Sequence, residues 1–151
     1  MILTAGLLVA IDGSKYSQNI VDYACDLAKQ LSESIVLIYV SKYPDLVEEY
    51  IEYGGQEPAP KAERYTKIAE LVTEKYGEQV KNAGVPCEEI IESGNPPEKI
   101  IQAATEKNVR MIVVGLKGLH GVERIRSLGS VARRVIENSP CPVLIVTGKK
   151  E

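Results

Sequence analysis

Glycine residues and a Gly-Ser pair near the carboxyl end of the sequence have the types and spacing that an anion site needs. The stretch VVGLKGLHGVERIRSLGSVARRVI contains Gly115, Gly118 and Gly121, followed by Gly129 and Ser130. Glycine lets main-chain amides approach an anion without an intervening Cβ. A helix amino terminus adds unpaired N–H groups and the positive end of the helix dipole. With the Ser130 hydroxyl as a further donor, this segment is suited to phosphate oxygens.

The same residues also have simpler interpretations. Loops contain glycine because turns need it, and Gly129 with Ser130 would also serve as an ordinary helix cap. Lys117, Arg124 and Arg126 favour anion binding slightly, although charged loop side chains are more often only solvated. The spacing therefore predicts an anion site without identifying the anion.

Asp12 is the second candidate, because it ends the apolar run LLVAID and is followed by Gly13 and Ser14. A carboxylate at the end of a buried strand can accept a hydrogen bond from a hydroxyl group or from a metal-bound water. The alternative is a turn or cap residue without a ligand. The position at the end of the first predicted strand favours the functional role.

Alternating strands and helices are needed to bring these residues together. The predicted strands are Leu7 to Asp12, Ser34 to Val40, Cys87 to Glu92, Met111 to Gly115 and Pro142 to Val146. The predicted helices are Tyr16 to Leu31, Lys61 to Asn82, one that begins near Pro97, and Gly129 to Asn138, with Val131, Val135 and Ile136 inward. Most strands are nearly continuous apolar runs, which is typical of strands buried on both faces. The alternation predicts an α/β fold with a parallel, doubly wound sheet.

In such sheets, ligands bind outside the carboxyl ends of the strands, where the strand order reverses. The residues that follow the strands should therefore gather on one rim. They are Asp12, Gly13 and Ser14; Ser41; Ser93, Gly94 and Asn95; and Gly115 through Ser130.

Composition limits the class of protein. The length of 151 residues predicts a single domain, 1–151, with a surface excursion at about 41–60 that has one or two helical turns around Leu46 to Tyr53. A formal net charge of −3 provides no basic field for a nucleic acid. His120 is the only histidine and the three cysteines form no CxxC pair, so neither a zinc site nor a disulfide framework is indicated.

Hydropathy predicts a protein that neither spans nor enters a membrane. No segment approaches the ~20 consecutive apolar residues that a spanning helix needs. The start of the chain lacks a positively charged leader before its apolar run. We therefore expect a soluble, cytoplasmic protein.

These motifs resemble those of the universal stress protein family over nearly the whole chain. The family opens with a strand that ends in an aspartate with a serine nearby, here LLVAIDGS, and has a glycine-proline turn before its third helix, here SGNPPEKII. It ends with a GxxG loop, a Gly-Ser helix start and a proline-led strand, here GLKG and LGSVARRVIENSPCPVLIV. The resemblance implies a three-layer sandwich of the adenine nucleotide alpha hydrolase-like type, with a five-stranded sheet in the order 3-2-1-4-5. It also implies a homodimer made by the last strand, Pro142 to Val146.

One branch of the family binds ATP or AMP and carries G-x-x-G, nine residues, and then G-S/T. Here ten residues separate Gly118 from Gly129, so one residue must bulge within Leu119 to Leu128. The resemblance implies that adenine contacts the main chain near Ala10 and Val40, and that Asp12 meets a ribose hydroxyl or the metal-phosphate region. Mg²⁺ or Mn²⁺ would accompany the nucleotide and involve Asp12 only indirectly. The full predicted nucleotide-binding set is Ala10, Ile11, Asp12, Ser14, Val40, Gly94, Val114, Gly115, Gly118, Gly129, Ser130 and Val131.

The leading hypothesis is an ATP- or AMP-binding regulatory domain of the stress response, which acts through nucleotide-dependent dimer or partner contacts. The sequence shows no obvious general base at the phosphate end, so any hydrolysis should be slow. The alternatives are a slow ATPase that uses Asp12, and a nucleotide-free dimeric scaffold, which the extra loop residue would favour. A phosphoacceptor domain of the response-regulator kind would need an acidic pair after the first strand and an aspartate after the third, where this chain has Asp12 alone and Ser93.

Overall fold

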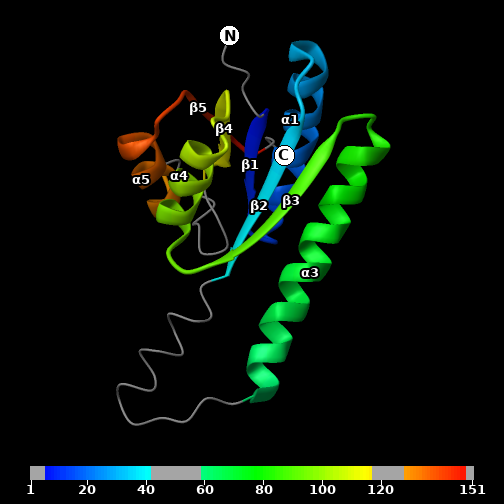
Figure 1. Cartoon of the computed structure of the whole chain (residues 1–151), viewed down its shortest axis with the longest axis vertical. Helices are drawn as coiled ribbons and strands as arrows, with labels where there is room; N and C mark the ends of the chain where they lie inside the picture. Colours follow the sequence, from blue (N-terminus) through cyan, green and yellow to red (C-terminus); the bar gives the residue numbers. More distant parts are fainter. Residues whose placement is uncertain (1–5, 42–58, 117–127, 149–151) are drawn as a thin grey trace.

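Five parallel strands form one sheet in the order β3-β2-β1-β4-β5 (Figure 1), which confirms the expected topology. The computed structural model describes residues 6–41, 59–116 and 128–148. The strands are β1 (Leu7–Ile11), β2 (Ile35–Ser41), β3 (Cys87–Ser93), β4 (Met111–Gly115) and β5 (Val143–Val146). The helices are α1 (Tyr16–Leu31), α3 (Ala59–Asn82), α4 (Pro96–Glu106) and α5 (Ser130–Asn138).

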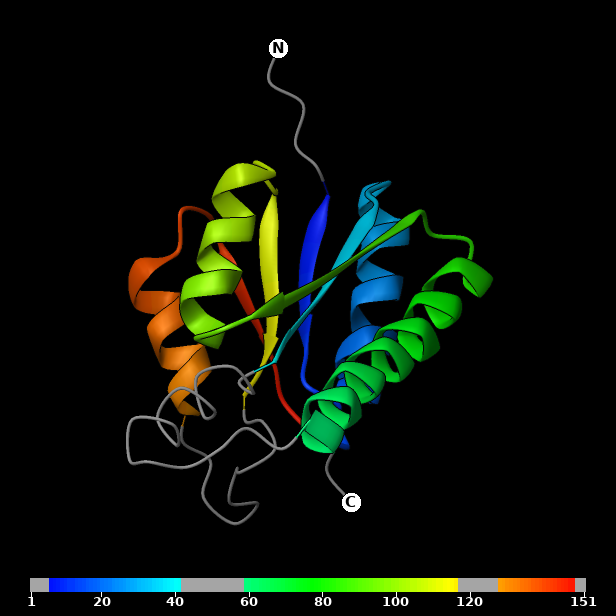
Figure 2. The same ribbon diagram turned by 60° about the horizontal axis from the view of Figure 1, so that its bottom comes forward.

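The helices cover both faces of the sheet. Helices α1 and α3 lie on one face, and α4 and α5 lie on the other (Figure 2). Alternate residues of β1 supply both apolar cores: Leu7, Val9 and Ile11 pack on the α1 side, whereas Leu8 and Ala10 pack on the α4 side. A strand that is covered on both faces packs its side chains against a core on either side, which explains why β1 has an uninterrupted apolar sequence.

Local signals set the bounds of several helices. Helix α1 ends where Ser32 adopts the left-handed conformation at φ 55° and its amide donates to the carbonyls of Ala28 and Lys29. Helix α4 begins after Asn95, whose side-chain oxygen accepts a hydrogen bond from the Glu98 amide at 3.2 Å. Its first residue is Pro96, one residue before the predicted start.

Three details differ from the sequence-based expectations. Helix α3 begins at Ala59 rather than Lys61, since a proline such as Pro60 is tolerated in the first turn of a helix. Ile136 was expected to be buried but is 44% exposed, because α5 lies at the edge of the sheet and buries only Ala132 and Val135. The helical turns expected around 46–53, and most of the 41–60 excursion, lie outside the described residues.

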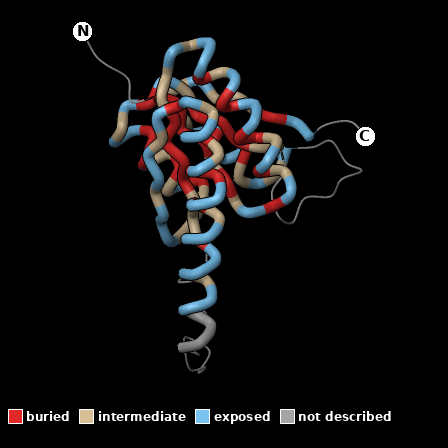
Figure 3. Tube along the Cα trace, turned by 90° about the vertical axis from the view of Figure 1, so that its right-hand side faces the viewer, coloured by how far each residue is buried: buried red, intermediate tan, exposed pale blue. Residues whose placement is uncertain are grey.

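Helix α3 extends past the carboxyl ends of the strands, and much of that part of it is exposed (Figure 3). Its outer side carries two exposed apolar side chains, those of Ile68 and Leu71. Among the helices that the structure describes, none combines the length and the apolar character required to cross a bilayer.

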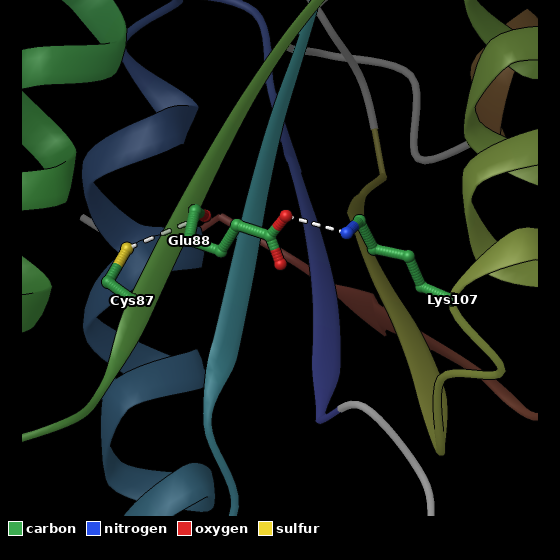
Figure 4. Close-up of polar contacts among 3 residues, drawn as sticks. All are labelled: Cys87, Glu88 and Lys107. Atoms are coloured by element: carbon green, nitrogen blue, oxygen red, sulfur yellow. Dashed lines mark hydrogen bonds and ion pairs between the residues drawn. The ribbon is translucent and has the colours of Figure 1, made fainter.

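Charged residues connect the edge strand β3 to both helix layers. The ammonium group of Lys107, directly after α4, lies 2.6 Å from Glu88 Oε1 (Figure 4). On the other side of the strand, Lys81 Nζ in α3 lies 4.0 Å from Glu89 Oε1. Both pairs are partly exposed, so we expect each to contribute well under about 1 kcal/mol to stability.

Candidate functional site

The strand order reverses between β1 and β4, and the predicted site residues flank that point. From β1 the chain runs outward to β2 and β3, and then crosses back to β4 and β5. Backbone pairing between β1 and β4 extends only to Val9 and Val113, although β1 continues to Ile11 and β4 to Gly115. The two strands are therefore not joined by a ladder at their carboxyl ends, which is where open α/β sheets bind ligands.

Four predicted site residues share one apolar cluster on the α4 and α5 side of the sheet. Val114 is buried in this cluster, and the half-buried side chains of Ala10, Val40 and Val131 pack against it. Ile11 points to the opposite face, where it is 4% exposed within the α1 cluster. Any contact of a ligand with Ile11 would therefore use its main chain. The half-buried side chains offer an apolar surface for a flat ring.

Asp12 is held in a turn between β1 and α1. Its Oδ1 accepts a hydrogen bond from the amide of Ser14 at 2.9 Å and another from the hydroxyl of Ser17 at 3.3 Å. The Ser14 hydroxyl accepts from the amide of Tyr16 at 3.3 Å, so Ser14 itself stabilises the start of α1. Gly13 makes this turn possible because its φ is +78°, a conformation that residues with a Cβ rarely adopt.

Tyr39 in β2 is a neighbour of Asp12 that the sequence-based prediction missed. The pKa of its phenol is raised, first by burial, then by the negative charge of Asp12 and then by Tyr65 in α3. Its register partner in the sheet is Ile11. The available signal was a hydroxyl-bearing aromatic side chain near the end of an otherwise apolar strand, SIVLIYV.

The start of α5 is the candidate phosphate site. Gly129 precedes the helix with φ −66° and ψ 163°, and as the N-cap residue it has no side chain with which to cap the first turn. The amide of Gly129 donates to the carbonyl of Leu116 at 2.8 Å. The amides of Ser130 and Val131, in the first turn, have no acceptor within the helix. The first turn itself contains no acidic residue, so no carboxylate within it offsets the positive end of the helix dipole.

The amide of Gly94 is used within the protein and is not available to a ligand on the rim. It donates to the carbonyl of Ser41 at 2.8 Å, which joins the ends of β2 and β3. A contact between Gly94 and a ligand would therefore involve its Cα or its carbonyl group. Gly115 ends β4 opposite Val146 of β5, and the amide of the next residue, Leu116, donates to the Val146 carbonyl at 3.0 Å.

Several candidates lie outside the described residues. Among them is Gly118 of the predicted binding set, together with Lys117, His120, Gly121, Arg124 and Arg126. Within the described ranges, no three His, Cys, Asp or Glu side chains form a group that would hold a metal ion. The groups on the rim suit a ligand that carries phosphates: helix amides donate to the anion, a fixed carboxylate accepts from hydroxyl groups, and an apolar cluster packs against a ring.

Comparisons with known proteins agree on one family. Residues 6–147 match the model of the universal stress protein family. Universal stress protein YxiE of Bacillus subtilis is 34% identical, with alignment of 93% of this chain and 97% of that protein. The universal stress protein from Archaeoglobus fulgidus in complex with dAMP superposes with a TM-score of 0.68 at 21% identity, covering 96% of this chain and 98% of the other. A universal stress protein in complex with cAMP gives a TM-score of 0.65 at 23% identity, covering 97% and 100%.

Proposed function

The chain belongs to the universal stress protein family, and on this basis we propose that it binds an adenine nucleotide, ATP or AMP, at the carboxyl rim of its sheet. The observation that carries the proposal is the start of α5, where the N-cap residue Gly129 has no side chain and its amide bonds Leu116 at the end of β4. This is the side of the sheet on which β1 and β4 no longer pair with each other. Two proteins of similar fold bind dAMP and cAMP, which supports an adenosine phosphate as the ligand class.

Each part of the nucleotide has matching groups on the rim. The adenine ring packs on the apolar cluster and contacts the main chain near Ala10 and Val40. The ribose hydroxyls donate to the carboxylate of Asp12. The phosphates accept hydrogen bonds from the amides of Ser130 and Val131 and lie near Gly115. Mg²⁺ or Mn²⁺ would neutralise charge on the phosphates, and Asp12 would meet it only through the nucleotide.

We further propose that the protein acts as a homodimer joined by β5. This strand is at the edge of the sheet, and Val143, Leu144 and Ile145 are only half-buried. An apolar edge strand invites pairing with another strand. The backbone bond from Leu116 to Val146 and the 2.8 Å bond from Asn19 Nδ2 to the Thr147 carbonyl connect the rim to this edge.

From the family match we propose a regulatory role in the stress response, in the cytoplasm, in which the bound nucleotide alters contacts at the β5 edge. The two hydrogen bonds offer a path from the rim to that edge. We expect no fast hydrolysis, because the described first turn of α5 contains no acidic residue that would act as a general base. Hydrolysis is at most slow. Phosphate release that is unchanged in Asp12→Ala would exclude Asp12 from any such reaction.

The ligand identity is tested by mass spectrometry of small molecules released from gently purified protein. We expect an adenosine phosphate at about one per protomer after loading with a mixture of ATP, GTP, CTP and UTP. Retention of all four nucleotides in equal amounts would contradict recognition of adenine. Retention of none, together with no binding in solution, would contradict the function itself.

A further inference from the structure

Ser17 is a fully buried polar residue in the apolar stripe of α1. The buried side of this helix consists of Ser17, Ile20, Val21, Ala24, Cys25 and Ala28. Ser17 is 0% exposed, yet an alanine is close to it in size, would bury no hydroxyl group and has a higher helix propensity. A hydroxyl that is removed from water needs a hydrogen-bonding partner, so its partners indicate why it is there.

Within the described part of the chain, the hydroxyl of Ser17 has two hydrogen-bonding contacts, and both are with Asp12. Ser17 Oγ lies 3.3 Å from the Asp12 amide nitrogen and 3.3 Å from Asp12 Oδ1. A hydroxyl has one proton to donate and lone pairs that accept. It therefore donates to the carboxylate and accepts from the amide.

This double contact fixes the conformation of Asp12. Because one hydroxyl meets both the main chain and the carboxylate of the same residue, it restricts the side-chain dihedral angle χ1 of Asp12. The Ser14 amide, 2.9 Å from the same Oδ1, adds a second donor that is part of the turn. The Ser17 amide is used separately, in a 3.1 Å bond to the Ser14 carbonyl. The hydroxyl of Ser17 thus bonds Asp12, whereas the amide of Ser17 stabilises the turn.

We infer that Ser17 is a positioning residue of the nucleotide site, which acts through Asp12 by holding its carboxylate toward the ribose hydroxyls. This inference rests on the proposed adenine-nucleotide site. Ser17 is buried beneath the rim, so it touches no ligand itself. Its contribution is to keep Asp12 in one orientation before the nucleotide arrives, which lowers the entropic cost of binding.

The first test needs no nucleotide. Three-bond NMR couplings to the Asp12 β-protons report whether χ1 has one value or is averaged. We expect one value in the wild type and averaging in Ser17→Ala. A single, unchanged χ1 in Ser17→Ala would overturn the inference. The matched control is Thr73→Val, because the Thr73 hydroxyl is also buried in a helix but bonds the Ala69 carbonyl at 2.6 Å.

The second test is a double-mutant cycle with ATP and magnesium. Ser17→Ala should raise the Kd roughly three- to tenfold, as expected for one lost hydrogen bond. In an Asp12→Ala background, the same substitution should have no further effect, because Ser17 acts only through Asp12. Equal effects in both backgrounds would overturn the inference. Thr73→Val should bind ATP as the wild type does.

The two tests separate the two claims. If the wild type binds no adenine nucleotide, the proposed function fails, and the NMR couplings still decide whether Ser17 orients Asp12. Ser17→Cys, which keeps a weak donor of similar size, should give a Kd between those of the wild type and Ser17→Ala. A Ser17→Cys variant that binds more weakly than Ser17→Ala would point to packing and overturn the positioning role.

Discussion

The amide nitrogen of Gly129 lies 2.8 Å from the carbonyl oxygen of Leu116, and this bond joins the end of β4 to the start of α5. The start of α5 thus lies next to the end of β4 on the rim. The start of α5 is fixed by contacts of Leu116 with Gly129 and Val146, rather than by the length of the connecting segment. One extra residue between Gly118 and Gly129 is therefore compatible with a phosphate site at this helix start.

Ser130→Pro is predicted to weaken nucleotide binding while preserving the fold. Proline removes both the amide and the hydroxyl at the first position of α5, a position where helices tolerate it. The extended conformation of Gly129, at ψ 163°, also suits a residue before proline. We expect a roughly tenfold higher Kd for ATP in calorimetry, as for loss of a hydrogen bond to a charged group, with the melting temperature nearly unchanged.

Ser130→Ala is the matched control, since it removes the hydroxyl alone and keeps the amide. Its Kd should lie between those of the wild type and Ser130→Pro. Wild-type affinity in a folded Ser130→Pro variant would show that the first turn of α5 does not hold the phosphates.

Gly13→Ala is predicted to reduce both stability and nucleotide affinity. The φ of +78° would cost about 1 kcal/mol with a Cβ present, and that Cβ would lie 3.3 Å from Val72 Cγ2. To relieve this contact and the unfavourable φ, the main chain at residue 13 would move, and the movement would also displace Asp12, the preceding residue. Urea unfolding and calorimetry measure the two effects. Gly84→Ala has a similar φ of +83° with open space around it, so it should lose stability but bind ATP normally.

Cys87 is predicted to react slowly with iodoacetamide below about pH 11. Burial, followed by the charge of Glu89, raises the pKa of its thiol from 9.0 to about 11, and only the thiolate reacts. Glu89→Gln should lower this pKa and speed the alkylation of Cys87 at pH 9, as followed by peptide mass spectrometry. An unchanged rate would show that the Glu89 charge does not reach the thiol.

The same pKa predicts a loss of stability at alkaline pH. Between pH 9 and about 11, the unfolded chain releases the Cys87 proton before the folded protein does. The unfolded state then binds fewer protons, so the free energy of unfolding falls as the pH rises through this window. Denaturant unfolding at pH 8 and pH 10.5 should show a smaller fall in Cys87→Ala than in the wild type.

Val143→Lys is predicted to separate the proposed dimer. A lysine on an edge strand opposes pairing with another strand, and Val143 is the first residue of β5. Light scattering should give twice the 16.5 kDa chain mass for the wild type and a single chain mass for the variant. A variant that remains dimeric would show that the interface lies elsewhere. A monomeric wild type would contradict the proposed dimer.

Periodicity was sufficient to predict a parallel sheet, because β1 and β4 are buried on both faces and their residues are almost all apolar. The strand order was implied by the family resemblance and not by the residue pattern. Periodicity was also sufficient to place Asp12, Gly115 and Ser130 on one rim, because parallel strands end on the same side. Side-chain contacts between different elements could not be predicted from periodicity. The bond from Ser17 to Asp12 joins residues five apart across a turn, and the proximity of Tyr39 to Asp12 depends on the pairing of β1 with β2.

The exact bounds of the helices and the burial of residues at the sheet edge could not be predicted from the sequence pattern either. The predicted helix began at Lys61, after the 41–60 excursion, whereas α3 already includes Pro60, because a proline early in a helix leaves no hydrogen bond unmade. Ile136 fits the apolar spacing of α5, but a helix at the edge has less sheet to cover. Gly94 was predicted to face a ligand, and only the three-dimensional structure shows its amide bonded to Ser41.

Calorimetric titration of the wild-type protein with ATP, ADP and AMP in the presence of magnesium tests the central claim most directly, with GTP as the matched control. We expect saturable binding of at least one adenine nucleotide at one per protomer, and weaker binding of GTP. Flat titrations with all three adenine nucleotides would contradict the claim that this rim is a nucleotide site.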